Sequence, residues 1–128
     1  MRRLAILLLL AGCASPPPAP ETKPAPPPPP SAPERKETIA IAGLMDSARN
    51  DAAAGRLSNA AATLERALRI EPANPRLWQE LARVRLQQGQ FAQAESTAMR
   101  SNSYAGSDAT LRAENERIIE SARAKRPR

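Results

Sequence analysis

The second half of the chain repeats itself at a spacing of about 34 residues, a period typical of helical repeat proteins. Shifting the residues from Ile39 onward by this distance brings together positions of the same chemical class. The matched pairs are Leu44 with Trp78, Ala48 with Ala82, Gly55 with Gly89, Leu57 with Phe91 and Ala60 with Ala94. In repeat proteins each unit buries its apolar face by packing against the next unit. The sequence therefore predicts a stack of similar units.

Each unit has the spacing of apolar residues that is typical of α-helices, and prolines are rare in it. We expect helices near residues 38–54, 58–70, 75–88, 91–102 and 108–124. Gly55 and Gly89 are expected to end the first helix of each unit, because glycine adopts positive φ angles without strain. Asn74 and Pro75 form an N-cap followed by proline at the first helical position, and Asp108 is expected to cap the last helix. These signals predict an all-α fold.

Small and large apolar residues take the two roles that helix packing requires. Four alanines at equivalent positions let paired helices approach closely, and larger side chains fill the space between them. The alanines are Ala48, Ala60, Ala82 and Ala94, and the larger residues are Leu44, Leu64, Trp78, Leu81 and Phe91. The apolar residues of the last helix share one stripe, and they are Leu111, Ile118, Ile119 and Ala122. A one-sided helix of this kind is suited to cover the open end of a stack.

This pattern resembles the tetratricopeptide repeat, with its bulky residue at position 4, small residue at 8, glycine near 15 and aromatic residue at 17. Repeat one corresponds to residues 41–74, and repeat two begins at Pro75. Asp51 and Arg85 replace the usual aromatic residue at position 11, and Gly106 replaces the proline that would close repeat two. The resemblance implies two helix-turn-helix repeats and a C-terminal capping helix.

The N-terminus has the features of an export signal. Two arginines follow Met1, and the apolar run from Leu4 to Ala11 is too short to span about 30 Å of hydrocarbon as a helix. The run ends in Leu-Ala-Gly-Cys, which resembles a bacterial lipobox and implies that the signal 1–12 is removed and that Cys13 is acylated. The resemblance implies three acyl chains, two on the sulfur of Cys13 and one on its new amine. Stable membrane anchoring needs about two such membrane-binding groups, so the protein is expected to stay on its membrane. The alternative is a secreted protein with an incidental cysteine in its leader.

A proline-rich segment follows the cysteine. Residues 16–33 contain 11 of the 14 prolines and no large apolar side chain, so they cannot bury enough surface to offset the entropy cost of ordering. We expect a disordered tether over 13–37, about 75 Å long when extended at about 3.1 Å per residue, ahead of a repeat domain over 38–128. The alternative is that Pro-x-x-Pro pieces bind an aromatic groove of another protein.

Composition argues against several classes of function. The chain has no histidine, its single cysteine is assigned to lipid, and no phosphate-binding loop or metal-ligand spacing is visible. Glu114 and Glu116 lie two residues apart on a helix, so their carboxylates point to different sides. Loss of the signal removes two arginines and lowers the net charge from +6 to +4, which is only mildly basic. The three aromatic residues of the chain are too few to form a surface on which nucleic-acid bases stack. We expect no enzyme activity, cofactor, metal or nucleic-acid partner.

The resemblance places one face of each first helix in a protein-binding groove. The polar residues at the groove positions are Arg49, Arg76, Gln79, Arg83 and Gln87. Arg49 and Arg83 are equivalent in successive repeats, and guanidinium groups repeated along a groove favour a partner that carries carboxylates. The alternative is that these arginines are ordinary solvent-facing charges.

Two further features are open to more than one interpretation. Tyr104 is either an exposed contact or a plug beneath the last helix. The basic tail is either a solvated terminus or a contact for anionic glycan or lipid, and it consists of Arg123, Lys125, Arg126 and Arg128.

In layout, the chain is similar to short outer-membrane lipoproteins that activate class A penicillin-binding proteins. The resemblance implies an outer-membrane location on the periplasmic side, since Ala14 follows the acylated position and an aspartate there would imply inner-membrane retention. It also implies that the tether carries the repeat domain through peptidoglycan to an inner-membrane synthase. Two alternatives remain, a pilotin-like or outer-membrane assembly accessory lipoprotein and a structural lipoprotein that binds peptidoglycan.

Overall fold

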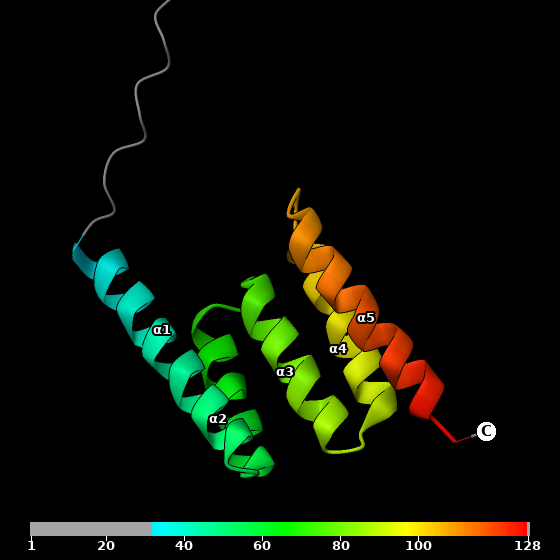
Figure 1. The fold of residues 1–128 in the computed structure, drawn as a ribbon. Helices are drawn as coiled ribbons and strands as arrows, with labels where there is room; N and C mark the ends of the chain where they lie inside the picture. Colours follow the sequence, from blue (N-terminus) through cyan, green and yellow to red (C-terminus); the bar gives the residue numbers. More distant parts are fainter. Residues whose placement is uncertain (1–31, 128) are drawn as a thin grey trace, which may run out of the picture.

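A computed structural model describes the backbone of residues 32–127 and the side chains of residues 38–127. This part of the chain forms α1 (Ala32–Ala53), α2 (Leu57–Ile70), α3 (Pro75–Gln87), α4 (Phe91–Tyr104) and α5 (Ala109–Lys125). Short turns join the helices, each of which packs against the next one along the chain, and α3 also contacts α1 and α5, so that the helices form two layers (Figure 1). The predicted all-α fold of two helical repeats and a capping helix is therefore confirmed. None of these helices combines the length and the apolar character that crossing a bilayer requires.

Helices α2 to α5 begin and end within two residues of their predicted positions, whereas α1 begins at Ala32, six residues before its predicted start. Its first turn includes Pro33, and a proline is tolerated there because the first backbone N–H groups of a helix have no intrahelical partner. The first six residues of α1 therefore belong to the segment predicted as linker. The signal 1–12, Cys13 and the rest of the predicted tether lie outside the described residues.

Equivalent glycines end the first helix of each repeat. Gly55 and Gly89 both have a φ of 77°, as predicted. The residue after each glycine donates its backbone N–H to the carbonyl at repeat position 11, at 2.8 Å from Arg56 to Asp51 and at 2.9 Å from Gln90 to Arg85. The two turns are therefore built alike, although a charged residue replaces the aromatic one at position 11.

Side chains cap α3 and α5 at their N-termini. The Asn74 Oδ1 accepts hydrogen bonds from the backbone N–H groups of Arg76 at 3.0 Å and Leu77 at 3.4 Å, with Pro75 at the first helical position. The Asp108 Oδ1 accepts one from the N–H of Leu111 at 2.9 Å. Both predicted caps are confirmed. They lie one repeat length apart in the sequence, so α5 begins in the register of a third first helix.

Two clusters of buried apolar side chains join the five helices of the described residues. The first lies between α1, α2 and α3 and includes Leu64, Leu77 and Leu81, while the second joins α3, α4 and α5 through Ala82, Ala98, Ile118 and Ile119. The four alanines predicted to allow close approach are all at most 1% exposed, and they are Ala48, Ala60, Ala82 and Ala94. Phe91, predicted as a core residue, is half-buried because it opens α4 at the edge of the stack.

A buried polar network also fixes α5. Asn115 is fully buried, and its Nδ2 donates to Ser101 Oγ and Asn102 Oδ1, each at 2.8 Å. Its Oδ1 accepts from the Nε2 of Gln79 at 3.1 Å, and Ser101 donates onward to the carbonyl of Pro75 at 2.8 Å. Every buried side-chain N or O atom in the described residues has a partner. The network thus ties α3, α4 and α5 together without the desolvation penalty of an unpaired polar group.

Candidate protein-binding surfaces

The first helices of successive repeats are linked by ion pairs that recur with the repeat. The Nη2 of Arg49 lies 2.8 Å from the Oε1 of Glu80, and the Nη2 of Arg83 lies 2.8 Å from the Oε2 of Glu114. Both arginines occupy repeat position 9, and both glutamates lie 31 residues further along the chain. Equivalent ion pairs thus join α1 to α3 and α3 to α5.

Beside the first of these ion pairs the surface is hollowed to a volume of about 250 Å³. This α1–α3 hollow has Ala52 and Ala53 of α1 on one side and Arg83 and Gln87 of α3 on the other. Buried apolar side chains of Leu64 and Val84 are also part of its lining. The hollow therefore combines an apolar base with a polar rim, as pockets for a protein side chain do.

The equivalent space between α3 and α5 is filled. One repeat length further along the chain, Leu86 takes the place of Ala52, and Ile118 takes the place of Val84. Ile118 belongs to the second apolar cluster, and Leu86 packs against that cluster. The two larger side chains close the gap that an alanine and a valine leave open in the first repeat.

The structure brings three of the five predicted groove residues together. Arg49, Arg83 and Gln87 line the α1–α3 hollow. Arg76 lies at the N-terminal end of α3 and forms an ion pair with Asp108 at 3.4 Å, away from the hollow. The prediction for Gln79 is wrong, because its side chain is 3% exposed and donates to Asn115 beneath α5. The groove position that Gln79 occupies in the repeat is covered here by the capping helix.

The groove arginines already have carboxylate partners within the chain. The hydrogen bond from Arg49 to Glu80 and the charge of Glu80 raise the pKa of Arg49 above its ordinary value, so this guanidinium stays charged. Glu80 is 13% exposed on its side chain, whereas Arg49 is 50% exposed. A partner carboxylate in the hollow would therefore share an arginine that a glutamate already neutralises in part.

The two charged residues at position 11 are accommodated by local pairs. The Asp51 carboxylate accepts from Arg56 at 2.7 Å, just beyond the turn that ends α1. The Nη1 of Arg85 donates to Thr97 Oγ1 at 2.8 Å, and its Nη2 lies 3.3 Å from Glu65. These departures from the repeat pattern therefore change the surface and leave the fold intact.

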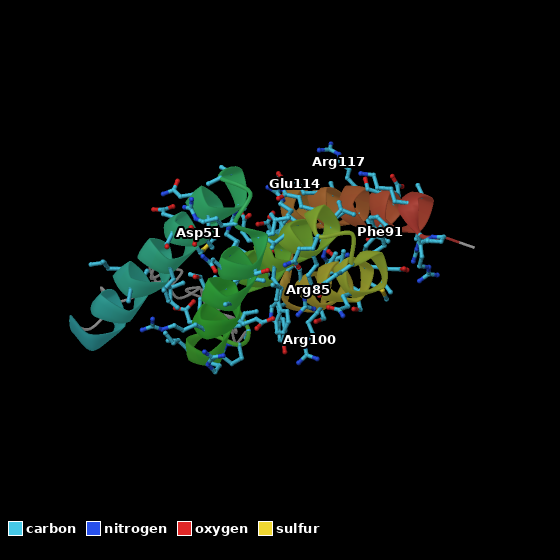
Figure 2. The ribbon with its side chains drawn as sticks, turned by 90° about the horizontal axis from the view of Figure 1, so that it is seen from below. Asp51, Arg85, Phe91, Arg100, Glu114 and Arg117 are labelled. Carbon is cyan, nitrogen blue, oxygen red and sulfur yellow. The ribbon has the colours of Figure 1, made fainter. Side chains whose placement is uncertain are left out.

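An arginine lies between two aromatic rings on the other side of the stack. The guanidinium carbon of Arg100 is 5.2 Å from the centroid of the Trp78 ring and 5.8 Å from that of Tyr104. Trp78 is half-buried and donates its indole N–H to the carbonyl of Pro72 at 2.7 Å. Figure 2 shows Arg85 and Arg100 on one side of the molecule and Glu114 and Arg117 on the opposite side. Tyr104, at 37% exposed, lies on the surface and is not a plug beneath α5.

Part of the basic tail is engaged in ion pairs. Glu95 of α4 accepts from Arg123 at 2.7 Å and lies 3.4 Å from Arg126. Lys125 is exposed, and Arg128 lies outside the described residues. Two of the four tail cations thus help to hold α5 on α4.

Acidic side chains elsewhere do not converge. As predicted, Glu114 and Glu116 point to different sides, the first to Arg83 of α3 and the second to Asn102 of α4 at 2.9 Å. No group of three histidine, cysteine, aspartate or glutamate side chains able to hold a metal ion occurs within the described part of the chain.

Sequence reasoning missed Glu80 and Asn115. A signal for Glu80 was present, because Asp46, Glu80 and Glu114 recur once per repeat length, in step with Arg49 and Arg83. The sequence held no equivalent signal for Asn115. Its role as a buried hub depends on where α5 lies against α3 and α4.

Comparison with known proteins agrees with this architecture. A sequence model described as a tetratricopeptide repeat matches residues 51–113. A comparison with curated proteins gives no match. Among solved structures, that of the globular C-terminal domain of P. aeruginosa LpoP is 42% identical, with a TM-score of 0.66, and the match covers 67% of this chain and 81% of that one.

The chain therefore belongs to the tetratricopeptide-repeat family, a class of helical stacks with protein-binding surfaces. Within that family it is LpoP-like, since it is similar to the P. aeruginosa protein over most of the helical region.

Proposed function

We propose that this chain is an outer-membrane lipoprotein that binds and activates a class A penicillin-binding protein, an inner-membrane peptidoglycan synthase. The observation that carries the proposal is the 42% identity to the LpoP domain over 81% of that domain. The lipobox at Cys13 and the proline-rich segment supply the anchor and the reach that such a function needs.

The α1–α3 hollow is the proposed binding site for the synthase. It is recessed, it has an apolar base, and its rim carries Arg83 and Gln87 as donors. A side chain or short loop of the partner fits a recess of this volume. Activation follows if the repeat domain binds the active conformation of the synthase more tightly than the resting one, because binding then shifts the population toward the active form.

Blocking the hollow tests the proposal. Ala52→Leu introduces the side chain that Leu86 provides in the second repeat, and it should fill the recess while the helices stay folded. We expect the full-length protein to stimulate glycan polymerisation or crosslinking by a purified class A synthase, and the variant to lose about tenfold or more of its affinity for the enzyme.

The matched control is Ala113→Leu, the same substitution at an exposed position of α5. It should leave both stimulation and binding unchanged, as measured by product formation and by surface plasmon resonance. Full stimulation by Ala52→Leu with an intact circular dichroism spectrum would exclude the hollow as the binding site. Failure of the unmodified protein to stimulate class A synthases would exclude the function itself.

A further inference from the structure

The side of the stack opposite the α1–α3 hollow has a second recessed surface. Helices α2 and α4 both pack on α3, but they do not contact each other within the described residues. One hollow of about 310 Å³ lies between them, and a second of about 320 Å³ lies between α3 and α4; Arg85 is part of the lining of both. Together they form a furrow, called the α2–α4 valley below.

Arg100 is placed at one end of this valley and differs both from Arg85 and from the arginines of the α1–α3 hollow. Arg49, Arg83 and Arg85 each lie within 3.3 Å of a glutamate oxygen, whereas Arg100 has no acidic partner among residues 38–127. Its contacts are the faces of Trp78 and Tyr104 and a 3.5 Å hydrogen bond to the Tyr104 hydroxyl. The rings attract the cation through their faces and leave most N–H groups on its edge free.

An arginine held in this way is prepared to bind a carboxylate. The planar guanidinium can donate two parallel hydrogen bonds to the two oxygens of one carboxylate. Stacking on the rings has already ordered the long side chain, so less entropy is lost when the carboxylate binds. Tryptophan, tyrosine and arginine are also the residues that most often dominate binding at protein interfaces.

The other end of the valley offers amide groups. Gln88, Gln90 and Gln93 line it, and their side chains make no hydrogen bond within the described part of the chain. A glutamine amide can donate to a carbonyl and accept from an N–H group, which are the two groups that an extended peptide backbone presents. From Gln90 to Arg100 the valley is about 15 Å long at the helical rise, a length that about four or five extended residues span.

We propose that the α2–α4 valley binds an extended acidic segment of a partner protein, with a carboxylate on Arg100 and the backbone against the glutamines. A furrow about 15 Å long fits a single extended chain of about four or five residues. The net charge of +4 that remains after loss of the predicted signal favours an acidic partner as well. This surface is separate from the α1–α3 hollow, so the inference does not depend on the proposed activation of a synthase.

Trp78 is the single tryptophan of the chain and therefore reports on this valley. The experiment titrates the full-length protein in mild detergent with a blocked heptapeptide of alternating glutamate and serine, while Trp78 emission is recorded. Saturable binding is expected, and the same peptide with glutamine in place of glutamate should bind at least about tenfold more weakly.

Three variants separate a specific site from general attraction. Arg100→Ala should weaken peptide binding about tenfold, and Arg100→Lys, which keeps the charge but loses the planar fork, about threefold or more. The control Arg117→Ala removes an exposed arginine of α5 that has no acidic partner in residues 38–127, and it should change binding by less than about twofold. Circular dichroism confirms that each variant is folded.

Three results of the peptide titration would overturn the inference. They are absence of saturable binding to the acidic peptide, equal weakening by the Arg100 and Arg117 substitutions, and equal binding of the glutamine peptide. Vesicles containing phosphatidylglycerol form a further arm of the experiment. If Arg100→Ala reduces binding to the vesicles and not to the peptide, the valley is a lipid-binding surface and the peptide proposal is wrong.

Discussion

At the scale of single residues, one buried side-chain amide, that of Asn115, connects α5 to α3 and α4. Asn115 has no exposed surface and contacts Gln79 of α3 as well as Ser101 and Asn102 of α4. An apolar residue of similar size would leave those polar groups without their partner in a place that water does not reach. Buried polar groups contribute little net stability when paired, but they cost stability when a partner is removed.

We therefore expect Asn115→Ala to lower the free energy of unfolding by about 2–3 kcal/mol. Urea unfolding followed by circular dichroism measures the difference. Asn59→Ala, at an exposed position of α2, is the control and should stay within about 0.5 kcal/mol of the unmodified protein. Equal effects of the two substitutions would contradict the role assigned to the network.

Two glycines separate the effect of backbone conformation from that of packing. An added Cβ would meet no atom within 4 Å at Gly43 or at Gly55, but Gly55 has a φ of 77° and Gly43 lies inside α1. Gly55→Ala should cost about 1 kcal/mol because alanine is strained at positive φ. Gly43→Ala should stabilise the protein by about 0.5–1 kcal/mol, since alanine favours the helix. Thermal unfolding should give a lower melting temperature for Gly55→Ala and a higher one for Gly43→Ala. A shift of both melting temperatures in the same direction would refute this explanation.

At the scale of helices, ion pairs at equal spacing connect each first helix to the next one. The pair between Arg49 and Glu80 is better shielded than the pair between Arg83 and Glu114, because the glutamate side chains are 13% and 38% exposed respectively. Solvent screening weakens the second pair more.

Double-mutant cycles to alanine should give a coupling energy of about 1 kcal/mol for Arg49 with Glu80 and about 0.3 kcal/mol for Arg83 with Glu114. The measurement is the free energy of unfolding in low salt and again in about 1 M salt, where screening is strong and the second coupling should vanish first. A larger coupling for the more exposed pair would be inconsistent with this ranking.

Most of the helical architecture could be predicted because its signals are local. Gly55, Gly89, Asn74 and Asp108 act on the backbone next to them, so their positions in the sequence are enough to place the helix ends. Pro33 misled the prediction for α1, since a proline marks the end of an extended segment and is equally compatible with a first helical turn.

The candidate site was harder to predict because it depends on which helix covers which face. Gln79 occupies a groove position of the repeat, yet α5 packs over it and places it inside. The hollow itself arises from a difference in size between Ala52 and Leu86, which has meaning only once α1, α3 and α5 are known to be equivalent. The cluster of Trp78, Arg100 and Tyr104 joins α3 to α4 at a distance that no sequence spacing reveals.

At the scale of the whole molecule, the repeat domain has two recessed surfaces on opposite sides, the α1–α3 hollow and the α2–α4 valley. The proline-rich segment lies outside the described residues except for Ala32 and Pro33, which belong to the first turn of α1, and its role as a spacer is a prediction. A spacer determines where the domain can reach without altering what the domain binds.

Deleting residues 16–33 tests that role. In the proposed function the shortened protein should stimulate a purified synthase as well as the full-length protein, but it should not complement a deletion strain. Complementation by the shortened protein would favour the assembly role, in which a partner at the outer membrane needs no reach. A scrambled segment of the same composition is the control and should complement fully.

The outward face of α5 has a consequence for how copies of the protein behave when they are crowded on a membrane. The positions that would receive another repeat there carry exposed polar or small side chains, namely Thr110, Ala113, Glu116, Arg117 and Glu120. These positions offer no apolar stripe against which a second molecule could pack to extend the stack, so head-to-tail growth into filaments is disfavoured. Each molecule then keeps both of its recesses free for other proteins.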